Sequence, residues 1–467
     1  MHQPLTIVFG THFKLHTMKK IILSFSLIAS MSVFSQEHFS GISTSKRGGL
    51  LSAANNPAEL ANMTTKYEVN VFNFSVAMAN NKLSISDLTS DDNIEDKLFE
   101  GNDPVNLRLD TQFFGPSFAF KKGKWGFGLN SSAYLKANAV NVDNELGEAI
   151  SNGGLSNLFT QTNLSSNKNQ RLNATTWGEL SFNIARNLMD SPIHKINVGT
   201  NIRLLFPGAY ANFSASNLNG TLVNNFGDIS LINASANINI SYAGVLANDF
   251  SDQGNYNEFF SQGINGYAFD LGFNYRLKDE NDANSYKLNT GLSIKNLGGM
   301  TFKSDNNLSK NYSLNIDGIE SLDINQFENV QSMEEIEAIL NDPANAGILQ
   351  TTSSSADVKI KLPTVINAYA DLRLHKKWFV TGTINQKISD DTESDVTTTQ
   401  NSYSLIPRFL SGWFEAYAPL AANEISGFTS GIGFRLAGFF IGSNSAFSAL
   451  ASDGKQADFY LGVRFGF

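Results

Sequence analysis

The side chains best placed to do chemistry are charged residues set into stretches that alternate with apolar ones. In an extended strand, successive side chains point to opposite faces, so these charges share one face with Asn and Gly while Leu, Ile and Phe occupy the other. A charged inner face could form a selectivity ladder or contact a ligand. The alternative is that the charges pair to hold an internal plug and the wall together. The candidates are Arg203, Asp270, Arg276, Asp371, Arg373, Arg435 and Arg464.

Two acidic clusters in expected loops suggest a second kind of chemistry. Carboxylate oxygens suit calcium or magnesium, but neither cluster has the calcium-loop spacing with its glycine. Solvated acidic loop tips are far commoner than metal sites, so we expect no bound metal. The clusters are Asp91-Asp92 with Glu95-Asp96, and Asp390-Asp391 with Glu393 and Asp395.

Histidine placement and the lack of cysteine argue against an enzyme. A hydrolase that uses histidine as its base needs one beside a nucleophile. With no cysteine in the chain, thiol catalysis, disulfides and thiolate metal sites are excluded. We therefore expect neither catalysis nor a cofactor. Of the six histidines, His2, His12 and His16 precede the expected mature start, His38 follows it closely, and His194 and His375 fall in expected short turns.

The elements that must position the charged residues are amphipathic strands. The apolar–polar alternation recurs along the whole chain, and its polar face is too rich in glycine for a sandwich core. We predict an all-β protein, a transmembrane antiparallel barrel of fourteen strands, an even number that suits a single-chain barrel. An error of one hairpin would give twelve or sixteen. The predicted strands are 67–79, 107–120, 125–138, 172–188, 195–213, 266–277, 286–302, 359–374, 378–389, 400–407, 413–419, 426–436, 439–447 and 457–467.

The predicted connections alternate between short and long. Outer-membrane barrels have short periplasmic turns and longer outside loops, so the short set predicts the periplasmic rim. Within the long links, Gly220–Tyr242 suggests an extra hairpin above the barrel, and Ser332 with Glu335 predicts a capped helix. The short links are 121–124, 189–194, 278–286, 375–377, 408–412 and 437–438; the outer links are 80–106, 139–171, 214–265, 303–358, 390–399, 420–425 and 448–456.

The N-terminal region predicts export. Residues 18–36 have a basic start, an apolar middle and small residues before Gln36, which is typical of a signal peptide cleaved after Ser35. We expect translation to start at Met18, so that residues 1–35 combine a mis-called extension with the signal peptide. The mature chain then carries 31 basic and 43 acidic side chains, because residues 1–35 hold three lysines and no acid. This net charge of −12 makes nucleic acid a poor partner.

The segment before the first strand carries the most specific motif. Asn56-Pro57-Ala58 ends a stretch rich in Gly and Ala, and Pro57 restricts Asn56 to an extended conformation, which predicts a turn. With Arg47-Gly48-Gly49 before it, this pattern resembles the FadL-type outer-membrane transporters of hydrophobic compounds, and more closely the related uncharacterised barrels of Bacteroidetes-type bacteria. The resemblance implies a hatch over residues 36–65, with Asn56, Pro57 and Ala58 inside the barrel formed by residues 66–467.

The expected function is passive uptake of a small hydrophobic or amphipathic compound, fatty-acid-like by resemblance, across the outer membrane of a Gram-negative cell. The alternative is a non-transporting surface barrel that docks secreted or periplasmic proteins. The expected partners are outer-membrane lipid, a hydrophobic ligand and the barrel-insertion machinery. Phe467 resembles the terminal signal read by that machinery. Deleting Phe467 or changing it to Asp should therefore lower assembly in the outer membrane before it affects any transport.

Overall fold

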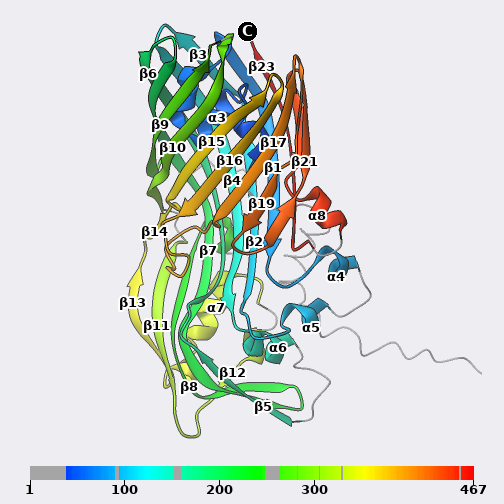
Figure 1. The fold of residues 1–467 in the computed structure, drawn as a ribbon. Coiled ribbons are helices and arrows are strands. Elements are labelled where there is room, and N and C mark those ends of the chain that lie inside the picture. Colours follow the sequence, from blue (N-terminus) through cyan, green and yellow to red (C-terminus); the bar gives the residue numbers. More distant parts are fainter. Residues whose placement is uncertain are drawn as a thin grey trace, which may run out of the picture.

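The computed structural model describes residues 38–89, 94–151, 159–247, 263–280, 282–303, 306–327, 330–451 and 454–467. In these ranges the strands form a closed antiparallel barrel (Figure 1). The ring consists of β1 (Tyr67–Asn80), β2 with β3 (Val105–Phe114, Ser117–Lys122), β4 (Trp125–Val142), β6 (Gln170–Asp190), β7 (His194–Asn225), β9 (Gly266–Asp279), β10 (Asp282–Phe302), β15 (Val365–His375), β16 (Trp378–Lys387), β17 (Ser402–Ser411), β18 with β19 (Phe414–Tyr417, Leu420–Asn423), β20 with β21 (Gly427–Ser430, Ile432–Leu436), β22 (Phe439–Ser443) and β23 (Gln456–Gly466).

Within the described residues these segments make fourteen strand positions, each hydrogen-bonded to the next. The ring closes between β1 and β23, whose register runs from Glu68 opposite Gly466 to Ala79 opposite Gln456. Closure leaves no open edge in the wall, as a lipid environment requires. The predicted all-β barrel and its strand number are confirmed, and each predicted strand overlaps one position of the ring.

The two faces of the wall differ in polarity as a membrane barrel requires. On β9, Phe269 and Leu271 point outward and are about half exposed, whereas Asp270 and Asn274 point inward and are fully buried. Apolar residues outside and polar residues inside are the reverse of a water-soluble protein, and they characterise the barrels of the Gram-negative outer membrane. In the part of the chain that the structure describes, no helix is long and apolar enough to cross a membrane.

The two ends of the barrel differ in their connections. Tight turns join the strands at the end where the chain terminates, at the top of Figure 1, and the long connections gather at the other end. This agrees with the predicted alternation of short and long links. The shorter elements at the far end are α4 (Ile85–Thr89), α5 (Ile94–Leu98), α6 (Asn144–Ser151), η2 (Gly244–Ala247), β14 (Val358–Lys361) and α8 (Ala446–Leu450).

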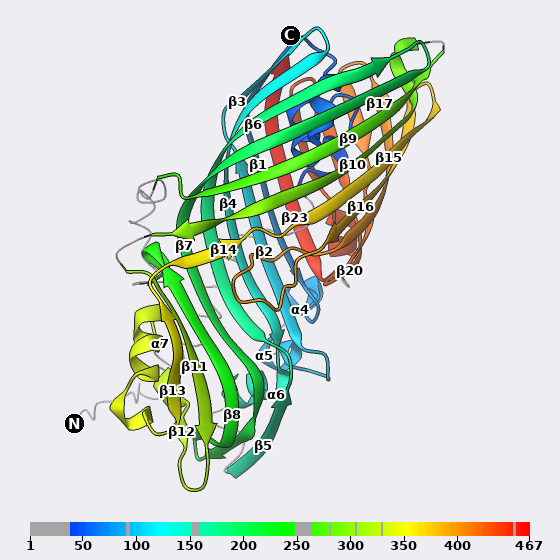
Figure 2. The same ribbon diagram turned by 90° about the vertical axis from the view of Figure 1, so that its left-hand side faces the viewer.

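An extension of the sheet continues beyond the barrel at the long-loop end (Figure 2). Strand β7 continues out of the wall and pairs there with β8, which confirms the expected extra hairpin. The capped helix is also confirmed, because Ser332 accepts a hydrogen bond from the Glu335 amide at 3.1 Å. The extension contains β5 (Phe159–Ser166), β8 (Asp228–Ala243), β11 (Leu308–Ile316), β12 (Leu322–Asp323), η4 (Asn325–Phe327), α7 (Met333–Leu340), η5 (Pro343–Asn345) and β13 (Leu349–Ser355).

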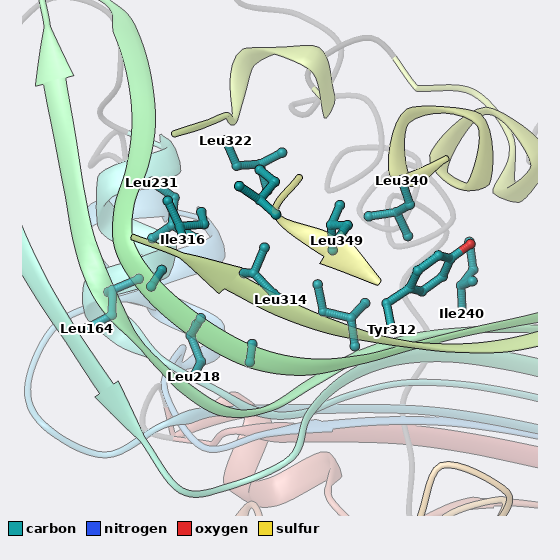
Figure 3. Packing of buried hydrophobic residues seen from close by; sticks show 14 of the residues in the cluster. Leu164, Leu218, Leu231, Ile240, Tyr312, Leu314, Ile316, Leu322, Leu340 and Leu349 are labelled. Atoms are coloured by element: carbon teal, nitrogen blue, oxygen red, sulfur yellow. The ribbon is translucent and has the colours of Figure 1, made fainter. Parts of the chain in front are cut away.

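The extension is held by its own apolar core. Tyr312 and Leu314 of β11, Ile240 of β8 and Leu340 of α7 are each no more than 4% exposed and belong to one buried cluster (Figure 3). Helix α7 covers one face of the sheet and supplies Leu340 to this core. Here the apolar side chains point inward, as in any water-soluble domain.

Candidate functional site: the barrel lumen

The lumen near the short-turn end contains residues 38–66, which we call the N-terminal segment. It forms α2 (Ser40–Ser43), α3 (Leu50–Asn55) and η1 (Pro57–Asn62), drawn in dark blue inside the barrel of Figure 1. Pro57 begins η1, where its missing amide hydrogen costs nothing. Asn56 has an extended backbone and caps η1 by accepting a hydrogen bond from the Ala58 amide at 3.0 Å. The predicted turn at this motif is therefore present.

Glycines on three neighbouring strands make room for this turn. A Cβ atom at Gly199 of β7 would lie 2.5 Å from the Pro57 carbonyl carbon, and one at Gly291 of β10 would lie 2.5 Å from the Asn56 amide nitrogen. A Cβ atom at Gly272 of β9 would lie closer still to Asn56. The Asn56 side chain also donates to the carbonyl oxygen of Phe273 at 2.8 Å. The wall is thus shaped to receive the Asn56-Pro57-Ala58 turn.

Glu59 of η1 is a buried carboxylate with a complete set of donors. The Arg276 guanidinium lies 2.8 Å from it, and the side-chain amides of Asn62, Asn274 and Asn289 donate to it at 2.9 Å each. Tyr369 donates its hydroxyl hydrogen to the same group. Because a buried charge is tolerated only when it is paired and hydrogen-bonded, this network fixes η1 against β9, β10 and β15.

Arg464 fastens the start of the N-terminal segment to the last strand. Its guanidinium donates to the backbone carbonyl oxygens of Arg47 and Gly48 and pairs with Glu68 at 3.2 Å. Glu68 in turn accepts a hydrogen bond from the Leu50 amide at 2.9 Å. Two of the predicted lumen residues, Arg276 and Arg464, therefore contact the N-terminal segment directly.

The other predicted lumen charges pair with the wall. Arg203 lies 2.6 Å from Asp270 and 3.4 Å from Glu179. Both Arg203 and Asp270 are buried and belong to neighbouring strands, β7 and β9. Their charges are therefore neutralised locally.

A second wall network surrounds Asp371, which lies 2.8 Å from Arg408 and accepts the hydroxyl hydrogen of Tyr286. Glu415 links Arg408 to Arg435, at 3.7 and 3.5 Å. The predicted candidates Asp371 and Arg435 thus belong to one chain of alternating charges that crosses several strands.

Arg373 lies apart from that chain. It pairs with Asp279, near the short-turn rim. The seven predicted residues are therefore not brought together at one centre. They lie in separate networks around the lumen, and their part in transport stays a prediction.

Several lumen residues were missed by sequence reasoning. Arg408 and Arg171 fell just outside the predicted strands, at 400–407 and 172–188, so the alternation could not assign them to a face. His38, placed only near the mature start, lies 2.8 Å from Ser75 and 3.0 Å from Asp110 inside the barrel. Glu59 was within the predicted hatch, but its partners come from strands more than 200 residues away. No local pattern could have identified them.

The structure tests the expectation of solvated loop tips for only part of the two acidic clusters. Asp91 and Asp92 lie outside the described residues. In the second cluster the expectation of a solvated tip is wrong for Asp391, which is 7% exposed and pairs with Arg108 at 3.3 Å and Lys387 at 2.6 Å. The physical reason is that this connection folds into the lumen, where cations on the wall neutralise it.

An apolar groove of about 970 Å³ lies on the lipid-facing side of the wall, across β10, β15, β16 and β17. Its floor consists of small residues, including Ala368 and Ala370, and large exposed side chains such as Leu292 and Tyr403 form its sides. Gly291 and Tyr369, which also line it, contact Asn56 and Glu59 on the inner side. The wall between groove and N-terminal segment is therefore thin.

Phe467 follows β23 at the short-turn rim. Its amide donates to the Tyr67 carbonyl oxygen at 2.9 Å, and its own carbonyl oxygen accepts from the Lys66 amide at 2.9 Å. The side chain itself is 71% exposed. Its backbone thus completes the seam with β1, while its role as an assembly signal stays a prediction.

A family model described as "Family of unknown function (DUF5723)" matches residues 57–444. The chain belongs to this family. The match begins at Pro57 in the turn described above and ends just after β22, so the DUF5723 region spans η1 and most of the barrel. None of the curated proteins matches the chain. The predicted resemblance to uncharacterised barrels agrees with this family match.

Solved structures similar to this DUF5723 chain include hydrocarbon channels of the FadL family. The P. putida toluene transporter TodX is 9% identical, with a TM-score of 0.38 over 89% of this chain and 92% of that chain. The "TodX deltaS2S3 mutant monoaromatic hydrocarbon channel" is 10% identical, with a TM-score of 0.42 over 89% and 93%. The "CymD monoaromatic hydrocarbon channel" is 12% identical, with a TM-score of 0.38 over 90% and 94%.

Proposed function

We propose that the protein is a passive channel of the outer membrane for small hydrophobic or amphipathic compounds, fatty-acid-like ones included, with the N-terminal segment as its hatch. The observation that carries the proposal is the N-terminal segment itself, which occupies the lumen near the short-turn end and is held there by Glu59 and Arg464. In this proposal a compound passes when the N-terminal segment moves. The proposed process is partition and diffusion, and it requires no catalytic residue.

The lipid-facing groove supports an apolar substrate. Burying apolar surface is favourable by about 25 cal/mol per Å², so an apolar compound would partition into such a site without an energy source. The groove lies behind the part of the wall that seats the Asn56 turn, where Gly291 separates inside from outside. Movement of that turn would give the shortest route between lumen and lipid.

Gly199→Ala tests the proposal. The added methyl group would meet the Pro57 backbone, so the N-terminal segment must shift and the channel should become leaky. Val198→Ile is the matched control, since it adds a methylene group on the opposite face of the same strand. Uptake of labelled toluene and oleate is measured in a deletion strain carrying each variant, together with conductance in planar bilayers. Equal uptake of every probe by the deletion strain with and without the wild-type protein would refute the proposal.

The second candidate function is a surface barrel that docks other proteins, and the extension favours it. Its sheet has a core of its own and lies beyond the barrel, which a channel does not require. A pull-down that recovers a stoichiometric partner, from a protein with no conductance and no uptake, would support docking over transport. Loss of that partner after deletion of the β7–β8 hairpin would locate the docking surface.

A further inference from the structure

The connection between β16 and β17 lies inside the barrel mouth. We call residues 388–401 the mouth segment; it follows β16 and is found near β14 in Figure 2. Val396, Thr397 and Thr398 are each 1% exposed, as in a packed core. A solvated outside loop would expose most of its residues, so this segment is a built part of the lumen.

The mouth segment starts at β16 and reaches β2 on the opposite side of the barrel wall. Arg108 of β2 pairs with Asp391 at 3.3 Å. Six strand positions separate β2 from β16 in either direction round the ring: β15, β10, β9, β7, β6 and β4 one way, and β17, β18/β19, β20/β21, β22, β23 and β1 the other. The segment therefore spans the full width of the lumen.

Arg171 of β6 makes the most hydrogen bonds to the part of the mouth segment that lies across the lumen, residues 391–396. It is fully buried and donates to the backbone carbonyl oxygens of Asp391, Ser394 and Val396 at 2.7, 3.4 and 3.1 Å. Tyr210 of β7 donates to the Ser394 carbonyl oxygen at 2.7 Å. A guanidinium has five donors and no acceptor, so Arg171 is well matched to a row of carbonyl groups.

Further contacts hold the sides of the mouth segment, among them Asn169, which donates to the Thr392 carbonyl oxygen at 2.6 Å. Lys361 of β14 accepts a hydrogen bond from the Thr397 amide at 3.0 Å and donates its own amide to Asp395 at 2.8 Å. Its side chain lies 3.0 Å from Glu393 and 3.1 Å from Asp395, and Lys387 lies 2.6 Å from Asp391. Each of these is an ion pair or hydrogen bond between polar groups that water could replace.

We propose that the mouth segment is the outer gate of the channel, closed in this structure and opened by detachment from Arg108 and Arg171. The inference rests on the proposed transport function and adds a second closure in series with the N-terminal segment. Arg108, Arg171 and Tyr210 belong to the wall, while the segment is joined covalently to β16 and β17 at its ends and bonded to Lys361 of β14 at its side. Detachment therefore swings the segment away from β2, β6 and β7 while the barrel stays closed.

A disulfide tests the gate directly. The hydroxyl oxygens of Ser214 on β7 and Ser394 on the mouth segment lie 3.0 Å apart, and the chain contains no cysteine. The double variant Ser214→Cys with Ser394→Cys can therefore form only this bridge within the chain. Oxidation should abolish conductance and uptake of labelled toluene and oleate, and reduction should restore both. The two single variants are the controls and should respond to neither treatment.

Asp391→Asn gives a second measurement that needs no substrate. Loss of the charge facing Arg108 and Lys387 should raise the frequency of opening in planar bilayers. Asp390→Asn is the control, because Asp390 is exposed and bonds only locally to Thr392. Unchanged conductance and uptake after complete bridging, verified by peptide mass, would overturn the gate. Absence of uptake in the wild type, with conductance that the bridge still blocks, would instead refute the hydrophobic substrate and keep the gate.

Discussion

Strand β7 passes through two regions of opposite polarity. Over residues 194–203 in the barrel, its buried side chains are polar, among them Asn197 and Arg203, and Ile202 lies on the opposite, lipid-facing side. In the extension, its buried side chains are apolar, among them Leu218 and Leu222. One strand, interrupted by a register shift near Asn217, therefore serves two solvents, because lipid surrounds the first part and water the second. The contrast shows that alternation alone identifies a strand but not which of its faces is buried.

The two regions also differ in what holds them together. The barrel interior combines buried charges that have specific partners with several smaller apolar clusters, whereas the extension depends on one large apolar cluster. Removing one member of a buried ion pair leaves the other without compensation, and removing an apolar side chain leaves a cavity. Substitutions in the barrel interior should therefore destabilise it by leaving unpaired charges, and substitutions in the extension by leaving cavities.

The largest effect is expected from Arg408→Ala in the barrel. Asp371 and Glu415 are fully buried; Asp371 would lose the cation that it pairs with and Glu415 would keep only Arg435, so the free energy of unfolding should fall by about 3–5 kcal/mol. Urea unfolding in lipid vesicles, followed by tryptophan fluorescence, measures it. Arg186→Ala, an exposed position at the rim, is the control. A loss no greater than that of the control would mean that the wall does not depend on this network.

Leu314→Ala should destabilise the extension and leave the barrel intact. The residue is 2% exposed in the apolar cluster, and such truncations cost about 2–5 kcal/mol. Hydrogen exchange should accelerate in β8 and β11 but not in β15 or β16. Ile319→Ala, at a fully exposed position, should change neither region. Accelerated exchange throughout the barrel would show that the two regions unfold as one unit.

A smaller effect is expected from Ser332→Ala at the start of α7. The serine side chain accepts the Glu335 amide hydrogen, and loss of such a cap costs about 1 kcal/mol. Hydrogen exchange of the first turn of α7 should quicken, and Ser332→Asp should restore protection because aspartate caps equally well. Equal exchange in all three proteins would indicate that packing alone fixes the helix.

The smallest effect is a pH dependence confined to the extension. Although burial raises the pKa of Glu337, hydrogen bonds from Lys310 and Tyr242 outweigh it and hold the pKa below its ordinary value. The carboxylate therefore contributes stability that is present above its unfolded pKa and lost as the pH falls through the folded pKa. Thermal unfolding of the extension between pH 7 and pH 3 measures this loss. Glu337→Gln should flatten the profile, and an unchanged profile would contradict the assignment.

The barrel could be predicted from the sequence because its wall repeats one signal. Each lipid-facing strand alternates apolar and polar residues, and the links alternate in length, so even the interrupted positions β18/β19 and β20/β21 were located. The extension was harder. Strand β13 (Leu349–Ser355) is almost entirely exposed and rich in serine and threonine, so its segment resembles a loop. Its pairing with β11 depends on a core shared by distant segments, which a local pattern does not record.

The lumen could be predicted only in part. The alternation of side chains along each strand placed Arg203, Asp270 and Asp371 on the inner face. It does not say which charged side chains pair with one another across the barrel. In the sequence, Asp391 is one of several acidic residues in a polar segment, and nothing near it distinguishes it from the others. Its burial follows from Arg108 and Arg171, which lie on strands formed more than 200 residues earlier in the chain. Such partnerships are properties of the closed ring.

The attachment of the N-terminal segment to Arg464 has a consequence for assembly. Gly48 and Arg464 are 416 residues apart, and the strand that carries Arg464 is also the one that seals the wall against β1. Pairing of β23 with β1 would therefore close the barrel and bring Arg464 to the N-terminal segment in the same step. We expect no assembly intermediate in which the barrel is closed while its lumen lacks this segment.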